Sequence, residues 1–334
     1  MERVTAADLE AAVRALRAGE LVAFPTETVY GLGADAGNPQ AVRRIFALKG
    51  RPARHPVIVH LHDVGQLPEW AREVPPAARR LAEQFWPGPL TLVLPRCAAV
   101  DDSVTGGQDT VALRVPAHPV AQQLLSAFGG GIAAPSANRY GRLSPTRAEH
   151  VREEFGDAVK LVLDGGDCPI GLESTIVAFQ HGAARLLRPG RITAADIRAL
   201  IGELAIGADL ASPRVPGSTA AHYAPTTPLS IVAAEQIDAH SAALARDGRR
   251  IAVLAWRAPR AAVPSVTWID AAAHAPQYGH DLYAHLRRLD KGGFERILVQ
   301  EVPEGEAWAA IRDRLRRAAA GAGSADANTQ AEAP

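Results

Sequence analysis

The chain has 334 residues, of which 47% are apolar and 22% charged, and its formal net charge is zero. This length predicts two domains of ordinary globular composition. A zero net charge argues against a protein that binds nucleic acid through an overall basic surface, so any RNA contact would need a local patch.

Targeting and redox signals are weak. The two cysteines, Cys97 and Cys168, lack the spacing of a zinc site or a disulfide framework, which favours reduced thiols in a cytoplasmic protein. The amino-terminal segment carries charges throughout and predicts no signal peptide. No apolar run approaches the ~20 residues that a membrane-spanning helix needs, so no membrane contact is expected.

The first predicted elements are a helix and a strand. Thr5 and Asp8 have the spacing of a capping box, and apolar residues then recur at helical spacing until Gly19. The apolar run Leu21–Phe24 predicts a strand that ends at Pro25.

A polar cluster follows this strand: Thr26, Glu27, Thr28, Tyr30, Gly31 and Gly33. Hydroxyl groups and glycines past a strand end suit a ligand that lies against the backbone. A predicted helix over Pro39–Leu48 then leads to Lys49 and Arg51, whose two cations predict an anion clamp. The next predicted strand, Val57–Leu61, carries His60 near its end.

Helices and strands continue to alternate along the chain. Strands are expected at Leu90–Leu94, Val111–Val115, Ile132–Ala134, Leu161–Asp164 and Ile176–Phe179, and helices at Pro75–Phe85, Val120–Phe128, Thr146–Phe155 and Ala194–Leu204. This alternation predicts an α/β domain whose polar clusters gather where strands end. The residues alone leave the roles of two positions open. Ser144 could either cap the helix from Thr146 or belong to a site. Thr110 could be either a strand-edge residue or a ligand contact.

The later part of the chain divides into three further segments. We expect a first α/β domain over 1–205, an extended linker over 206–228, a C-terminal α/β domain over 229–318 and a disordered tail over 319–334. The linker is rich in proline, yet it contains His222 and Tyr223, which an inert spacer does not require. In the C-terminal domain, strands are expected at Leu229–Val232, Ile251–Leu254 and Ile297–Val299, and helices at Tyr278–Leu289 and Trp308–Ala319.

The motif inventory restricts the chemistry. The sequence has no phosphate-binding G-x-x-x-x-G-K-[ST] loop, no G-x-S-x-G nucleophile elbow and no H-E-x-x-H metal motif. At the starts of predicted loops, the sequence instead places cations, hydroxyl groups, an amide and histidines. Such residues suit electrostatic stabilisation of a phosphoryl group and recognition of an amino acid. The residues alone therefore indicate a site for a nucleotide and a small anion.

A set of motifs in register carries this interpretation further. FPTETVYGLGADA, KGRP, HPVIVH, WPGPLTLVLP, ALRVP, APSAN, LSPT, ESTIV, LRPG and HYAP occur in this order. With these motifs the chain resembles the YrdC-like threonylcarbamoyl-AMP synthases in their long form, over about residues 5 to 318. The resemblance implies an α/β fold: a YrdC-like twisted mixed open sheet with helices, and a smaller Rossmann-like C-terminal domain.

The resemblance also implies a reaction. L-threonine, bicarbonate and ATP would give L-threonylcarbamoyladenylate and pyrophosphate, with Mg²⁺ accompanying the ATP. The product would pass to a tRNA threonylcarbamoyl transferase complex, which modifies the adenosine beside the anticodon, and a weak RNA contact is conceivable at that stage. The expected compartment is the cytoplasm.

The resemblance assigns roles residue by residue. The implied threonine pocket is Thr28, His60, Arg114, Ala134 and Ser174. The implied ATP side is Lys49, Arg51, His55, Thr110, Ser136, Asn138, Ser144 and Arg188, with Tyr223 from the linker, and Lys49 and Arg51 as the catalytic cations. Two positions depart from the family pattern: His55 replaces a common asparagine, and Arg54 stands where an acidic residue is common.

Two other functions compete with this interpretation. The first is a module that binds double-stranded RNA or tRNA without adenylyl transfer, which the zero net charge disfavours. The second is a carbamoyl-transfer module of the kind found in hydrogenase maturation, which needs cysteine-rich fingers that two separate cysteines do not supply.

Overall fold

The computed structural model describes residues 4–180, 182–246 and 248–323 and separates into two compact units. The first unit comprises Met1–Arg139 and Ser144–Ser218, and the second comprises Tyr140–Leu143 and Thr219–Pro334. The predicted linker therefore divides at residue 218, and a short segment from the first half of the chain packs with the second unit.

The first unit is built on a mixed sheet, which confirms the predicted fold class. Its strands are β1 (Val22–Phe24), β2 (Gly31–Asp35), β3 (Ile58–His60), β4 (Leu90–Pro95), β5 (Thr110–Arg114), β6 (Ile132–Ala133), β7 (Leu161–Val162), β8 (Thr175–Gln180), β9 (Ala183–Arg188) and β10 (Ala205–Ile206). They are ordered β10-β9-β8-β4-β5-β3-β6-β2-β1-β7. Strand β5 runs parallel to β3 and antiparallel to β4, so the ends of β3 and β5 share one edge with the starts of β4 and β8.

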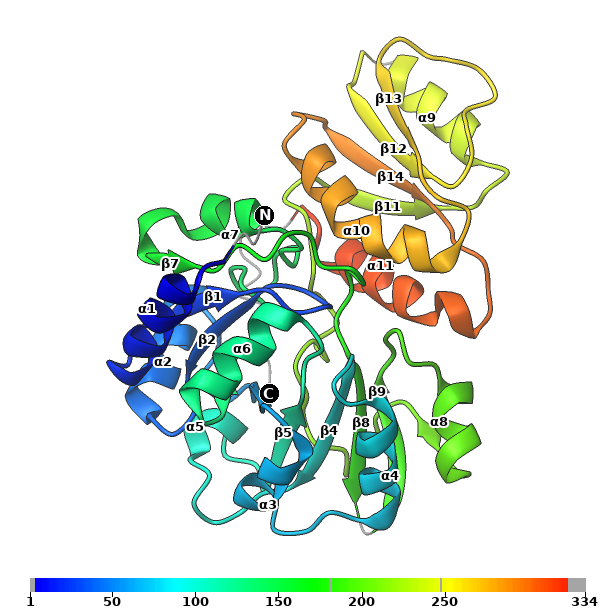
Figure 1. The fold of residues 1–334 in the computed structure, drawn as a ribbon. Helices are drawn as coiled ribbons and strands as arrows, with labels where there is room; N and C mark the ends of the chain where they lie inside the picture. The colour runs from blue at the N-terminus through cyan, green and yellow to red at the C-terminus, as the bar shows by residue number, and fades with distance from the viewer. Residues whose placement is uncertain (1–3, 181, 247, 324–334) are drawn as a thin grey trace. The chain divides into compact units, whose positions relative to one another are not determined.

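Helices accompany this sheet (Figure 1). They are α1 (Ala6–Arg17), α2 (Pro39–Lys49), α3 (Leu67–Trp70), α4 (Pro76–Phe85), α5 (Asp102–Thr105), α6 (Pro119–Phe128), α7 (Ala148–Phe155) and α8 (Ala194–Ile201), with 3₁₀ turns η1 (Val64–Gln66) and η2 (Gly156–Ala158). Helix α1 begins at the predicted capping box, in which Thr5 and Asp8 bond reciprocally. Helix α2 ends at Gly50, whose left-handed conformation (φ 61°) releases the chain toward Arg51.

Alternation along the strands creates two distinct cores. Val22 and Phe24 of β1 pack with α1 and α6, whereas Ala23 points to the opposite face and joins the main core with α2 and α4. A third cluster lies on β3, β4, β5 and β8, where Val215 of the predicted linker packs on Ile58 and Ala112. The first part of the linker is therefore part of the first unit, where it packs on its sheet.

The second unit is a parallel sheet with helices (Figure 1). Its strands are β11 (Leu229–Val232), β12 (Ile251–Ala255), β13 (Val266–Asp270) and β14 (Arg296–Gln300), ordered β11-β14-β12-β13. Its helices are α9 (Ile237–Arg246), α10 (Ala275–Asp290) and α11 (Ala309–Gly321), with 3₁₀ turn η3 (Glu306–Trp308). All strand pairs are parallel, which confirms the Rossmann-like architecture predicted for the C-terminal domain.

Several local features were missed or left open by the sequence. The polar stretch after β1, for which no second strand was predicted, contains strand β2, and Gly33 makes room for packing: a Cβ atom there would come within 2.8 Å of the Phe24 ring. Of the two roles left open for Ser144, the structure excludes the cap, because helix α7 begins after Arg147 without a side-chain cap. The sequence also gave no signal for strand β13 or helix α9, whose apolar periodicity is short.

Two predicted boundaries also differ from the structure. Strand β10 spans residues 205 and 206, and α11 continues to Gly321, beyond residue 318. The residues of the predicted tail from 324 onward lie outside the described part of the chain.

Candidate functional site

Arg114 is the centre of a buried polar group at the end of β5. Its guanidinium forms an ion pair with the Glu27 carboxylate at 2.6 Å, and its Nη1 donates to the Thr28 hydroxyl at 2.9 Å. Its Nε donates to the carbonyl oxygen of Gly88 at 3.2 Å. Thr28 in turn lies 2.8 Å from the hydroxyl of Thr26. The segment after β1 is thus joined directly to β5, although about 86 residues separate them in sequence.

His60 lies beside Arg114 because β3 and β5 are paired in register at these two residues. Its ring makes an edge contact with Phe24, with centroids 6.0 Å apart. Burial, together with the nearby positive charge of Arg114, lowers the pKa of His60 to about 3. His60 is therefore a neutral imidazole at physiological pH.

Ser174 extends this group across the sheet. Its hydroxyl lies 2.7 Å from the Thr91 hydroxyl on β4, and Arg188 donates to both its carbonyl oxygen (3.0 Å) and its hydroxyl (3.1 Å). Leu92 pairs with Leu113, which places Thr91 across from Arg114. One sheet edge therefore brings together Ser174, which directly precedes β8, Thr91 on β4, Arg114 on β5 and His60 on β3.

Strand alternation places these side chains on one face of the sheet. Ile58, Ala112, Val93 and Ile176 form the cluster that Val215 covers, and each lies two residues from a member of the row. The row therefore shares its face with the first part of the linker. Ala134, just after β6, lies beside β3: its N–H donates to the carbonyl of Ile58, two residues before His60.

Lys49 holds a second polar group together. Its buried ammonium donates to the carbonyl oxygens of Ser136, at 2.6 Å, and of Asn138. Burial, and secondarily the charge of Arg51, lowers the pKa of Lys49 well below its usual value. Because an ammonium has three donors, at least one remains for an anion.

The loop that Lys49 holds is also fixed along β2. Leu32 N–H donates to the Pro135 carbonyl and Ala137 N–H to the Tyr30 carbonyl, both at 2.8 Å. Ser136 pairs with Gly31 in an isolated bridge. The loop after β6 is therefore held from two sides, by β2 and by the end of α2.

Arg51 and His55 follow Lys49 in the same electropositive region. Arg51 Nη2 donates to the Pro56 carbonyl at 2.8 Å, and the residue is buried. Burial and the charges of Arg51, Arg214 and Arg54 lower the pKa of His55 to about 4. The structure thus brings the predicted cations Lys49 and Arg51 into one neighbourhood, with a neutral His55 beside them.

Ser144 is buried and belongs to a third pair. Its hydroxyl donates to Glu173 Oε1 at 2.5 Å, and Glu173 directly precedes Ser174. Arg188 reaches the linker as well, because its Nη1 donates to the Pro216 carbonyl at 2.9 Å. Through these contacts Ser144, Ser174 and Arg188 form one connected network.

Two predicted residues stand outside these contacts. Thr110 is half-buried at the start of β5, where it pairs with Pro95 of β4. Tyr223 lies in the second unit, buried against Arg314 and His222.

The sequence indicated no role for Thr91 or Glu173, and it placed Glu27 in a polar cluster without indicating its partner. All three lie inside the quoted motifs, in FPTETVYG, WPGPLTLVLP and ESTIV. The sequence position of Glu27, between a predicted strand and a cluster of cations, could have indicated an ion pair, because buried carboxylates are nearly always paired.

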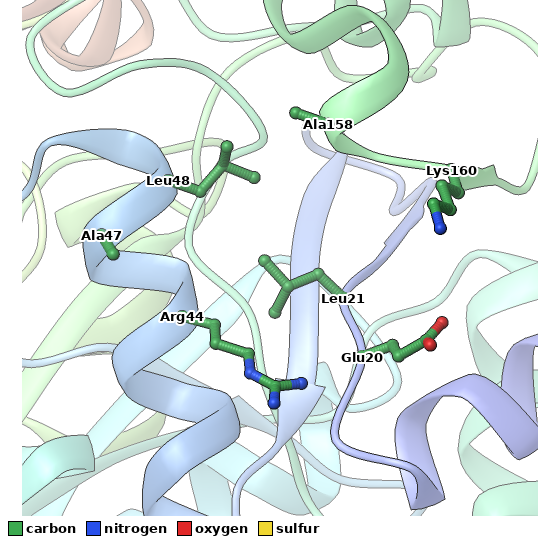
Figure 2. A pocket seen from close by; sticks show the side chains of 7 residues that line it. All are labelled: Glu20, Leu21, Arg44, Ala47, Leu48, Ala158 and Lys160. Carbon is green, nitrogen blue, oxygen red and sulfur yellow. The ribbon is translucent and has the colours of Figure 1, made fainter.

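A separate hollow of about 420 Å³ lies between the end of α2 and the 3₁₀ turn η2 (Figure 2). It is lined by apolar and charged side chains: Leu21, Ala47, Leu48, Ala158, Glu20, Arg44 and Lys160. It contains none of the predicted site residues, so we do not assign the chemistry to it. Among the described residues no group of three histidines, cysteines or carboxylates is arranged to hold a metal ion.

Comparison with known proteins identifies the family. Residues 14–190 match the family described as Telomere recombination, which groups Sua5, YciO and YrdC, and residues 192–320 match the family described as Threonylcarbamoyl-AMP synthase, C-terminal domain. The chain is 39% identical to the threonylcarbamoyl-AMP synthase of Pyrococcus abyssi, over 95% of both chains. It is 41% identical to that of Bacillus subtilis, over 92% of this chain and 91% of the relative.

The chain belongs to the threonylcarbamoyl-AMP synthase family. A member of this family from Schizosaccharomyces pombe is 36% identical over 94% of this chain and 89% of the relative. The crystal structure of P. abyssi Sua5 complexed with L-threonine superposes with a TM-score of 0.87 at 39% identity, covering 93% of this chain and 94% of that one. The long form of the threonylcarbamoyl-AMP synthases predicted from the motifs is thereby confirmed. No helix in the described part of the chain is long and apolar enough to cross a membrane.

Proposed function

We propose that this chain makes L-threonylcarbamoyl-AMP and pyrophosphate from L-threonine, bicarbonate and ATP. The observation that carries the proposal is the row of Ser174, Thr91, Arg114 and His60 on one face of the sheet, in a chain that matches the synthase of P. abyssi over both of its units. That relative has been crystallised with L-threonine, which supports an amino-acid site in the same fold.

Threonine would bind at the row through its charged and hydroxyl groups. The Arg114 guanidinium is the cation for the carboxylate, because it is buried and held by Thr28 and Gly88. Glu27 balances this charge before substrate arrives. Neutral His60 and the small Ala134 shape the pocket without adding charge, and the hydroxyl of Ser174 suits the substrate side chain.

ATP would bind at the electropositive region around Lys49 and Arg51. The roles proposed for His55, Thr110, Ser136, Asn138, Ser144, Arg188 and Tyr223 remain those expected from the motifs. Lys49 already fixes the backbone of Ser136 and Asn138, so its remaining donor and the Arg51 guanidinium would face the triphosphate. Mg²⁺ would arrive with ATP, coordinated by phosphate oxygens as this hard cation prefers.

The chemistry then needs charge neutralisation more than an acid or base. Threonine loses one ammonium proton to solvent, and its amine nitrogen attacks the carbon of bicarbonate. A second amine proton leaves with the bicarbonate hydroxyl as water, which gives a carbamate. A carbamate oxygen attacks the α-phosphorus as the bond to the pyrophosphate oxygen breaks. Lys49 and Arg51 would stabilise the negative charge that accumulates on the departing pyrophosphate.

The product suits a later acyl transfer. A mixed anhydride with AMP is a reactive donor, so a transferase that modifies tRNA would consume it. We place this synthesis in the cytoplasm, where ATP, threonine and tRNA meet.

The decisive experiment measures pyrophosphate release and product mass with each substrate omitted in turn. We expect release to require threonine and bicarbonate together, and a product with the mass of threonylcarbamoyl-AMP. Release at the full rate without threonine would contradict the proposal. Salt-dependent RNA binding with no ATP consumption would favour the RNA-binding alternative.

A further inference from the structure

Helices of the second unit hold two separate stretches of chain that lead to proposed site residues. The first is the segment 140–143, which leaves the first unit after Arg139 and returns at Ser144. The second is the end of the linker, residues 219–227, which contains Tyr223. We call them the loop segment and the strap.

Helix α10 binds both stretches near its C-terminal end. Arg287, which is only 8% exposed, donates to the carbonyl oxygen of Leu143 in the loop segment. One turn later, the Asp290 carboxylate accepts from the N–H groups of Thr226 (3.0 Å) and Thr227 (2.7 Å) in the strap. A buried charged donor on a backbone carbonyl contributes more to stability than a neutral hydrogen bond does.

Helix α11 holds the strap along its length. The fully buried Arg314 lies over the Tyr223 ring, with its guanidinium carbon 5.3 Å from the ring centroid, and pairs with Asp313 at 2.6 Å. The Arg317 side chain donates to the Thr219 carbonyl. The backbone carbonyl of Arg317 accepts a hydrogen bond from His222 N–H. A Cβ atom at Gly321 would lie 2.9 Å from the Cβ of Ala224, so the strap packs directly on the helix backbone.

The loop segment and the strap are also joined to each other. Ala224 N–H donates to the Gly141 carbonyl at 2.8 Å, and Arg142 pairs with Ala224 in a parallel bridge. The Tyr140 and His222 rings meet edge to face at 5.6 Å. Tyr223 has a positive φ of 58°, an unusual conformation for a bulky residue, which persists where surrounding contacts enforce it.

The loop segment has proposed ATP residues on both sides. Asn138 lies two residues before Tyr140, and Ser144 follows Leu143 directly. A shift of the loop segment therefore acts directly on both, because only Arg139 separates it from Asn138 and Ser144 follows it without a gap. The proposed threonine residues Arg114 and His60 lie on strands that do not adjoin this segment in sequence. Ser174, also proposed for threonine, is linked to Ser144 indirectly, through Glu173.

We propose that Arg287 and Arg314 are positioning residues for ATP: through them the C-terminal unit fixes the loop segment and the strap, and so sets nucleotide affinity without affecting threonine affinity. This inference rests on the proposed function and assigns the C-terminal unit a part in it. If these arginines served only the stability of their own unit, their loss would lower stability and leave the ratio of the two affinities unchanged.

The test uses the full-length chain with Arg287→Met and Arg314→Met. Methionine keeps an apolar stem of similar length and removes the guanidinium. The matched controls are Arg288→Met and Arg316→Met, which change exposed arginines on the same two helices. The measured quantities are the Kd of α,β-methylene-ATP and the Kd of L-threonine alone, both by calorimetry, with circular dichroism to verify folding.

We expect each buried-site variant to weaken α,β-methylene-ATP binding by about tenfold or more while threonine binding stays within about twofold of the wild type. Both control variants should bind both ligands as the wild type does, and Arg287→Lys should recover part of the loss. If Arg314→Met does not fold, Asp290→Ala takes its place, since it removes the acceptor for the strap at a less buried position.

Two results would overturn the inference. One is wild-type affinity for α,β-methylene-ATP in folded Arg287→Met. The other is an equal loss of affinity for both ligands. A failure of the proposed function is distinguished from these, because it appears in the wild-type chain as an absence of threonylcarbamoyl-AMP.

Discussion

Arg114 and Glu27 form an ion pair of 2.6 Å in which both side chains are almost fully buried. The pair places a carboxylate of the protein where a substrate carboxylate is expected to bind. Glu27 is held there independently, because its second oxygen accepts from Ala117 N–H at 2.9 Å. The unliganded pair is therefore electrically balanced, and in the proposed function a threonine carboxylate would share the guanidinium with Glu27.

The first prediction concerns this shared guanidinium. Arg114→Met should reduce threonine affinity about 100-fold, because a charged hydrogen-bonded contact of this kind is worth several kcal/mol. It should also lower stability by about 3–5 kcal/mol, since Glu27 is left as an unpaired buried charge. Calorimetric titration and urea unfolding measure the two effects. Threonine affinity equal to that of the wild type would remove Arg114 from the pocket.

The second prediction tests whether Glu27 only balances the charge of Arg114 or also contacts threonine. Glu27→Gln keeps the shape of the side chain but removes its charge, so Arg114 becomes the uncompensated partner. We expect the unliganded variant to have a lower Tm, and threonine to raise that Tm by more than it raises the Tm of the wild type. A smaller ligand-induced shift would mean that Glu27 itself binds threonine, for example at its ammonium group.

The third prediction concerns Lys49. Lysine occurs at only three positions of the chain, Lys49, Lys160 and Lys291. Lys49→Met removes the donor to the Ser136 and Asn138 carbonyls and one phosphate-facing charge, so synthesis should fall by about 100-fold or more. Lys160→Met, at an exposed position in the same unit, is the matched control and should retain full activity. Initial rates of pyrophosphate release measure both, and equal rates would contradict a role for Lys49.

Much of the fold follows from the sequence, and the exceptions have physical causes. Strands β1, β3, β4 and β5 were predicted within a residue or two because their apolar runs end at prolines or polar residues. Strand β2 was missed because GLGAD lacks β-branched residues; it is a strand because it pairs with β1 on one side and with β6 on the other.

The site, like the fold, could be predicted from the sequence only in part. The sequence supplied the side chains but not their partners, because a partner such as Glu27 or Glu173 is defined by strand register and burial rather than by spacing. Ser144 illustrates this point: its position before a helix suggested a cap, yet its hydroxyl donates to Glu173, 29 residues away. Long-range pairs of this kind depend on the order β8-β4-β5-β3, which no local pattern encodes.

The fourth prediction follows from that pair. Ser144→Ala leaves a buried acceptor on Glu173 without this donor, which should cost about 1–3 kcal/mol of unfolding free energy. Because Ser144 adjoins the loop segment, the KM for ATP should also rise. Ser126→Ala, at an exposed position in α6, provides the control and should change neither quantity. An unchanged stability in Ser144→Ala would show that Glu173 is satisfied by other donors.

The last prediction is a pH dependence of stability that arises from His60. Its pKa is about 3 in the folded chain, against an ordinary value near 6.5. The folded state therefore holds His60 neutral, while the unfolded state takes up a proton once the pH falls below about 6.5. Stability from this group is complete above that pH and is lost progressively as the pH falls toward 3. At pH 5 the loss amounts to about 2 kcal/mol.

His60→Asn tests this because asparagine does not titrate. Urea unfolding of both proteins from pH 8 to pH 5 should show a difference in free energy that narrows by about 2 kcal/mol toward pH 5, since only the wild type loses the His60 contribution. The histidines elsewhere, including His55 with its pKa of about 4, are common to both proteins and cancel in the comparison. A difference that stays constant across this range would mean that His60 becomes protonated at the same pH in the folded and unfolded chains.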